Sequence, residues 1–131
     1  MSLETESNCT ITNLTKSKLP RLPFLSMKEV VLGNTYNLSL VFAYGNLLKM
    51  LNRTYRNRNT VCDILSFPLS ESAGEIFISL NQAQKEAKKF GRNFENFVGF
   101  LFIHGLAHLE GLEHGSRMEA REKKFRRKFG I

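Results

Sequence analysis

The chain has 131 residues, the size of one domain with a core large enough to be stable without disulfides or a structural metal. Its composition is that of an ordinary globular protein, and its two cysteines, Cys9 and Cys62, stand too far apart for a Cys-rich zinc motif. The longest apolar stretch, residues 97–109, is too short to span a bilayer, and the first ten residues lack the apolar segment of a signal peptide. We therefore expect a single cytoplasmic domain over residues 1–131.

The formal net charge of +7 is concentrated near the C-terminal end. Between Arg117 and Lys128 there are seven Lys or Arg residues against two Glu, so this stretch carries five of the seven net charges. A cationic helix attracts polyanions such as RNA. The alternative is a solvated helix whose cationic end suits its own dipole, and charge alone favours neither interpretation.

Hydrophobic periodicity predicts strands and helices that alternate along the chain. The predicted strands are residues 9–14, 36–44, 64–68 (ended by Pro68) and 75–80. The predicted helices are residues 25–32, 45–55, 82–90 and 94–109, and a last charged helix that begins at Ser116. We expect Asn81 and Asn93 to cap the third and fourth helices, and Glu119 to take the capping-box position of the last one.

These elements predict an α+β (or α/β-like) domain with one mixed sheet of about four strands packed with about five helices. The helix at 94–109 is hydrophobic on nearly all sides, so we expect it to be the buried central helix. The order of the strands does not follow from the pattern.

All three histidines fall within eleven residues of this central region. His104 and His108 are four residues apart on the predicted helix, so both rings leave from one face, and Gly111 permits a turn that brings His114 back as a third ligand. Three imidazoles leave the fourth position of a zinc ion open for water, which is typical of catalytic zinc. We predict one Zn²⁺ per chain on these three residues, although nickel or copper would bind too. The alternative is three ordinary histidines on a partly buried helix.

The histidine spacing matches that of metzincin zinc proteases, with one departure. Those enzymes carry a glutamate directly after the first histidine as general base, and this chain has Gly105 there. A glycine inside a helix costs about 1 kcal/mol relative to alanine, so Gly105 serves either a close approach of backbone or substrate, or helix–helix packing. Without the glutamate, a peptidase is a disfavoured interpretation.

Three segments, in order, resemble the YbeY-type rRNA maturation factors, which are bacterial single-strand-specific endoribonucleases. They are Leu-Asn-Arg-Thr-Tyr-Arg at 51–56 with Asp-Ile-Leu-Ser-Phe-Pro at 63–68, Gly-Glu-Ile-Phe-Ile-Ser at 74–79, and His-Gly-x-x-His-Leu-x-Gly-x-x-His at 104–114. The resemblance covers roughly residues 37–125 and does not reach the first 35 residues. The chain departs from the family pattern at Asn59, Val61-Cys62, Glu75 and Leu112-Glu113.

The resemblance implies a mixed sheet packed with helices, a zinc ion on the three histidines, and an essential arginine in the Tyr-Arg pair, here Arg56. It also implies roles in 16S rRNA 3′-end processing, 70S ribosome quality control and late ribosome assembly, with rRNA and ribosomal subunits as partners. We expect Arg56 and His108 to be catalytically essential, with Arg56 clamping a phosphate, and Arg53 and Arg58 to extend the RNA-binding surface. The alternatives are a structural ion pair for Arg56 and solvated charges for Arg53 and Arg58.

The general base stays open at the level of sequence. Glu110 and Glu113 either hold a histidine's second nitrogen or face solvent, and Asp63 is either near the chemistry or a turn residue. The 2′-hydroxyl of RNA is an alternative nucleophile to water. Five phenylalanines at helix or strand spacing are expected in the core rather than as base-stacking residues, namely Phe77, Phe94, Phe97, Phe100 and Phe102.

Two other functions remain compatible with the sequence. One is a non-catalytic ribosome-assembly factor that uses its metal and basic surface only to bind RNA. The other is a zinc hydrolase that acts on a peptide or a small molecule.

Overall fold

The computed structural model describes residues 2–6, 8–111 and 115–131, and these contain five strands and five helices. The strands are β1 (Ser2–Glu6), β2 (Cys9–Asn13), β3 (Asn37–Ala43), β4 (Ile64–Ser70) and β5 (Ala73–Ser79). The helices are α1 (Phe24–Leu32), α2 (Gly45–Arg56), α3 (Leu80–Lys89), α4 (Phe94–Leu109) and α5 (Ser116–Phe129). The predicted α+β class, with one sheet and five helices, is confirmed.

The strands form one mixed sheet in the order β1-β2-β3-β5-β4. The three inner strands β2, β3 and β5 run parallel, whereas β1 pairs with β2 and β4 pairs with β5 in antiparallel fashion. The sheet has one strand more than the pattern predicts. This extra strand is β1, whose sequence SLETE contains a single apolar residue and so gives no hydrophobic signal.

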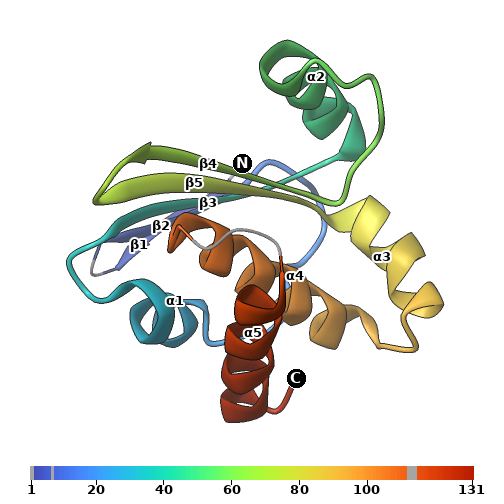
Figure 1. Ribbon diagram of the computed structural model, residues 1–131. Coiled ribbons are helices and arrows are strands. Elements are labelled where there is room, and N and C mark those ends of the chain that lie inside the picture. Colours follow the sequence, from blue (N-terminus) through green and yellow to red (C-terminus); the bar gives the residue numbers. More distant parts are fainter. Residues whose placement is uncertain (1, 7, 112–114) are drawn as a thin grey trace.

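Helices cover the two faces of the sheet unequally. Figure 1 shows α1 and α4 beneath one face, with α5 outside α4, while α2 lies beyond the opposite face. The main core lies between the sheet and α4, and its fully buried members include Leu40, Ile76, Ile78, Phe97, Phe102, Ile103 and Leu106. A smaller apolar cluster beneath α2 is built on Ala43, Leu48 and Leu65. The central position predicted for the helix at 94–109 is therefore confirmed.

Strand β4 does not end at its proline. It continues to Ser70, with a register shift between Pro68 and Ser70. Proline is tolerated here because β4 is the outermost strand, where a missing backbone N–H costs no hydrogen bond to a further neighbour. The prediction that Pro68 ends the strand is therefore wrong. Whether a proline ends a strand depends on whether that strand is central or at the edge, and the strand order is not visible in the sequence.

Helix α3 begins two residues earlier than predicted. Its N-cap is Ser79, whose Oγ accepts a hydrogen bond from the Gln82 backbone N–H at 3.2 Å. Asn81, the predicted cap, instead uses Oδ1 to accept from the Gly45 backbone N–H at 3.0 Å. Asn81 therefore connects the start of α3 to the start of α2.

The last two helices differ in how they begin. Asn93 caps α4 as predicted, with Oδ1 accepting from the Asn96 backbone N–H at 2.8 Å. Helix α5 starts at Ser116 after an N-cap at Gly115 that makes no side-chain hydrogen bond, so the capping box expected with Glu119 does not form. In the described parts of the chain, no helix is long and apolar enough to cross a membrane.

Candidate active site

Helix α4 leaves one row of side chains accessible. Most of its residues from Phe97 onward are buried, but Asn96, Phe100, His104 and His108 are each partly exposed. They are spaced four residues apart, so they follow one side of the helix over roughly 18 Å. The two histidines are therefore part of a linear surface feature on an otherwise buried helix.

The structure places His104 and His108 side by side. Their ring centroids are 4.7 Å apart and the rings are nearly perpendicular, at 88°. Adjacent imidazoles on one helix face can bind the same metal ion. Leu112, Glu113 and His114 lie outside the described residues, so the third ligand stays a prediction. Among residues 8–111 and 115–131, no group of three His, Cys, Asp or Glu side chains is close enough to hold a metal.

A buried carboxylate from α5 holds the first histidine. Glu122 is only 6% exposed, and its Oε1 lies 2.9 Å from His104 Nδ1. When Nδ1 donates to this carboxylate, Nε2 carries the lone pair that a metal ion requires. The Glu122 carboxylate thus fixes the orientation of the His104 ring and leaves Nε2 suited to bind a metal ion.

Glu122 is the candidate site residue that the sequence reasoning missed. In the sequence it looks like one of two acidic residues on a basic, solvated helix. The available signal is its spacing, because Met118, Glu122 and Phe125 are the buried residues of α5 and follow helical periodicity. A glutamate within an apolar row needs a buried partner.

Glu110 pairs with Arg121 and not with a histidine. Its carboxylate accepts hydrogen bonds from Arg121 Nε at 3.2 Å and from Arg121 Nη2 at 2.5 Å. This pair connects the end of α4 to α5. Glu110 therefore stabilises the helix pair, and the histidine-holding role belongs to Glu122.

Gly105 packs directly against the sheet. A Cβ at this position would come within 2.9 Å of Ser66 Oγ, 3.0 Å of Ile64 Cδ1 and 3.1 Å of Ile76 Cδ1. The close approach is thus between a helix and a sheet rather than between two helices. The position has no room for the glutamate side chain that a zinc peptidase places there.

Arg56, at the end of α2, approaches β4 from the face of the sheet opposite to α4 (Figure 1). Its Nη2 donates to the Ser66 backbone carbonyl at 2.7 Å, and its Cζ lies 5.4 Å from the centroid of the Phe67 ring. The Ser66 hydroxyl in turn reaches the Gly105 carbonyl at 3.5 Å, so one residue of β4 contacts both Arg56 and α4. None of the ion pairs between described residues includes Arg56.

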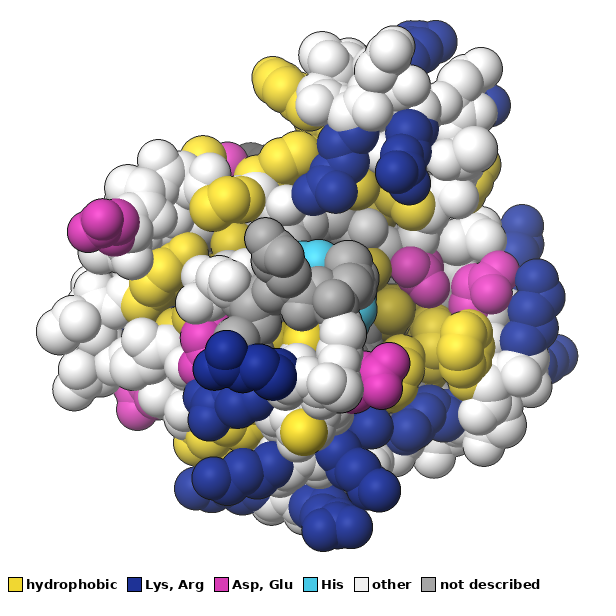
Figure 2. Space-filling view, in the orientation of Figure 1, with side chains coloured by type: hydrophobic (Ala, Val, Ile, Leu, Met, Phe, Trp, Pro, Cys, Tyr) yellow, Lys and Arg dark blue, Asp and Glu magenta, His cyan; other side chains and the backbone are white. Residues whose placement is uncertain are grey.

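Basic side chains lie on both sides of the histidines. Arg53 and Arg58 are exposed near the same end of α2 as Arg56. Figure 2 shows Lys and Arg side chains over α2 above the central histidines and over α5 below them. The accessible surface around His104 and His108 is therefore bordered by positive charge at two edges.

Asp63, directly before β4, is close enough to His104 for their charges to interact. Burial raises the pKa of the Asp63 carboxyl, with Glu86 raising it further and His104 lowering it. Its backbone carbonyl accepts from the Ser79 N–H at 2.9 Å, which fixes the start of β4 against β5. A partly buried carboxyl with a raised pKa, near the histidines, is a candidate for proton transfer.

The five phenylalanines divide by position. Phe97 and Phe102 are fully buried, as expected. Phe94, Phe100 and Phe77 are only partly buried and pack against the edges of the two apolar clusters. The core expectation therefore holds for the inward-facing members only.

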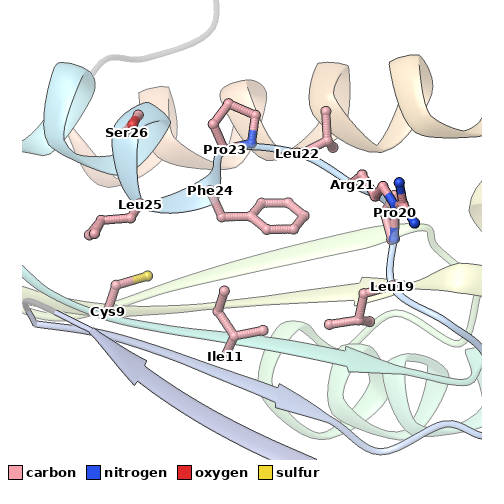
Figure 3. Close-up of a pocket in the computed structure, with 10 residues that line it drawn as sticks. All are labelled: Cys9, Ile11, Leu19, Pro20, Arg21, Leu22, Pro23, Phe24, Leu25 and Ser26. Carbon is pink, nitrogen blue, oxygen red and sulfur yellow. The ribbon is translucent and has the colours of Figure 1, made fainter.

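A cavity of about 450 Å³ lies away from the histidines, between β2 and the segment that leads into α1 (Figure 3). It is lined mainly by apolar side chains, among them Ile11, Leu19, Leu22 and Phe24. Its lining includes the thiol of Cys9 but no His, Asp or Glu, so it offers no cluster of acid–base or metal-binding groups.

Comparisons with known proteins agree on one family. The family model described as endoribonuclease YbeY matches residues 4–129. The endoribonuclease YbeY of Heliobacterium modesticaldum is 34% identical over 137 residues, covering 86% of this chain and 82% of that protein. The enzymes of that name from Alkaliphilus metalliredigens and Carboxydothermus hydrogenoformans are 36% and 38% identical, covering 70% and 68% of this chain. The chain spans 66% of the length of each of these two.

The fold has a counterpart among solved structures. The solution structure of a Thermotoga maritima protein is similar with a TM-score of 0.62, over 89% of this chain and 85% of that one, at 23% identity. The family model also extends beyond the 37–125 resemblance to include most of β1 and β2. The resemblance inferred from the three segments is thus confirmed, and the chain belongs to the endoribonuclease YbeY family.

Proposed function

We propose that the protein is a metal-dependent, single-strand-specific endoribonuclease that acts in rRNA maturation, including 16S 3′-end processing, and in 70S ribosome quality control. The nuclease class and an RNA substrate follow from membership in the family. Ribosomal subunits are the proposed partners and the cytoplasm the proposed location. The observation that best supports the site is the pair His104 and His108 with the buried Glu122 behind His104.

The adjacent rings of His104 and His108 suit two ligands of one metal ion. His104, His108 and His114 would hold one Zn²⁺, with Glu122 fixing the ring of His104. When bound, the metal supplies Lewis-acid chemistry by polarising a phosphate oxygen or a water molecule. His108 acts in catalysis as a member of this ligand set.

Arg56 is proposed to bind the phosphate next to the metal. One guanidinium nitrogen is already fixed by the Ser66 carbonyl, and the Cζ atom lies 5.4 Å from the centroid of the Phe67 ring, so the remaining N–H groups are partly pre-oriented. The planar fork of arginine suits two phosphate oxygens at once. Arg53 and Arg58 extend this contact along the RNA backbone.

The two other functions differ in what supports them. A peptidase is opposed by the packing of Gly105 against the sheet, which leaves no place for the general base of that class. A non-catalytic assembly factor would share the basic surface, the metal ligands and Arg56 as an RNA-binding residue. Cleavage therefore distinguishes it from the nuclease.

We expect zinc-loaded protein to cut single-stranded rRNA fragments, and Arg56→Ala to slow this cleavage by roughly a hundredfold or more, since it removes charge stabilisation at the phosphate. The metal content should be unchanged because Arg56 is not a ligand. Cleavage is measured on gels with labelled 16S 3′-end RNA and with a duplex of the same sequence.

Lys49→Ala is the matched control, since Lys49 is an exposed cation on the same helix. If wild type leaves RNA intact at every zinc concentration, or if Arg56→Ala cuts as fast as wild type, the proposed role fails. RNA binding without cutting would favour the assembly factor.

We expect Glu122→Gln to weaken zinc binding about 10- to 100-fold, because it removes the anionic partner of His104 Nδ1. Zinc affinity is measured by competition with a chromophoric chelator. Glu119→Gln removes the same charge from an exposed position on the same helix and should leave zinc affinity within a factor of two or so. Equal affinities for wild type and Glu122→Gln would show that the carboxylate has no role in metal binding.

A further inference from the structure

The accessible row on α4 continues beyond the histidines to Phe100 and Asn96, one and two helical turns from His104. A cavity of about 420 Å³ lies between α4 and α5 beside His104 and Phe100. Its lining includes the cations Lys123 and Arg126 and the carboxylates Glu119 and Glu122. A second hollow of about 390 Å³, at the start of α4, includes Arg92 and Asn96. Two hollows therefore lie along α4, one beside His104 and one at its N-terminal end, and each has an arginine in its lining.

Two arginines from different elements meet on the Phe100 ring. Arg92 Cζ lies 4.6 Å and Arg126 Cζ 5.2 Å from the ring centroid. Arg92 Nη1 also donates a hydrogen bond to Asn96 Oδ1, which fixes its orientation. Neither arginine takes part in an ion pair within residues 8–111 and 115–131.

Within the described part of the chain, these two neighbouring positive charges form no ion pair with a carboxylate, although Glu119 and Glu122 line the same cavity as Arg126. Both side chains are half-buried. Burial lowers the pKa of Arg92, and the neighbouring Arg126 lowers it further. Like charges held together in partly desolvated surroundings repel each other, and a bound anion relieves that repulsion. Surface arginines that serve only solubility have no reason to converge in this way.

We propose that Arg92 and Arg126, packed on Phe100, form a phosphate-binding subsite that holds the RNA strand on one side of the cleaved bond. This inference rests on the proposed nuclease function and names where its substrate runs. Arg56 binds the phosphate at the metal on the β4 side, and the strand continues past His104 along the α4 row.

The subsite predicts a split between binding and chemistry. Arg126→Gln and Arg92→Gln should each weaken the binding of a single-stranded 2′-O-methyl RNA of twelve nucleotides about tenfold, and lower the slope of log affinity against log salt by about 1. The methylated RNA resists 2′-hydroxyl attack. Binding is measured by fluorescence anisotropy with zinc-loaded protein. On cleavable RNA of the same length, KM should rise while kcat stays near the wild-type value.

Two controls separate the subsite from general charge and from folding. Lys128→Gln removes an exposed charge from the same helix and should change affinity less than twofold. Arg126→Lys keeps the cation and should restore most of the binding. Melting temperatures of all variants show whether each is folded before its affinity is compared.

Three results would overturn the proposal. Affinity unchanged in both Gln variants would make the arginine pair a purely structural cation–π contact. A loss of the same size in Lys128→Gln would make the effect one of net charge. Binding of polyglutamate that depends on the two arginines, with RNA binding unaffected, would assign the subsite to an acidic protein instead. If wild type binds RNA through this pair but never cuts it, the subsite stands and the proposed nuclease activity alone is wrong.

Discussion

His108→Ala is expected to bind less than a tenth of the zinc of wild type and to lose measurable RNA cleavage. The substitution removes one of the two histidines on α4 whose ring centroids are 4.7 Å apart. Two ligands hold zinc far more weakly than three. The measurement is metal content by mass spectrometry, on protein purified without chelators or a histidine tag. Wild type should contain about one zinc per chain and lose its activity when the zinc is chelated.

Asn96→Ala is the control for His108→Ala. Asn96 lies on the same row of α4 but has no role in the ligand set, so metal content should equal that of wild type. Zinc retained in full by His108→Ala would mean that His108 is not a ligand. Wild type that takes up no metal even after zinc is added would leave a basic RNA-binding domain as the better description.

Gly105→Leu is expected to lower the free energy of unfolding by about 3 kcal/mol, because the new side chain has no space between α4 and the sheet. Its Cβ alone would come within 2.9 Å of Ser66 Oγ, and the neighbouring Ile64 and Ile76 close the other sides. The gain in helix propensity over glycine, about 1 kcal/mol, offsets only part of this. Urea unfolding followed by circular dichroism gives the change in free energy.

Ala120→Leu provides the comparison for Gly105→Leu. Ala120 is exposed on α5, so the same added leucine should change stability by less than about 0.5 kcal/mol. If Gly105→Leu were as stable as wild type, α4 would have to sit further from β4 and β5 than described. The distance between Arg56 and the histidines would then differ as well.

The sequence predicted the elements whose signal is local and strong. The α4 region combines a nearly continuous apolar stretch with Asn93 before it, so its existence, its cap and its central position were all predictable. The family was predictable for a different reason, since three segments of the chain, among them the Tyr-Arg pair and the histidine segment, resemble the family pattern in the right order. The role of each site residue remains for the experiments above.

Features that depend on tertiary neighbours were not predictable in the same way. Strand β1 has almost no apolar character and forms because β2 offers it a partner. Ser79 rather than Asn81 caps α3 because Asn81 is engaged by the start of α2. Glu122 looks like a surface charge until α5 is packed on α4, where it meets His104. In each case the deciding contact comes from another part of the chain.

The irregular end of β4 also bears on self-association. An outermost strand normally presents unpaired N–H and C=O groups to which a second chain can add, and this is a common route to aggregation. Pro68 lacks the N–H that such pairing would use, and the register shift beside it breaks the regular repeat. This edge therefore resists strand-to-strand addition of another copy, and concentrated protein should be protected from fibril growth on that side.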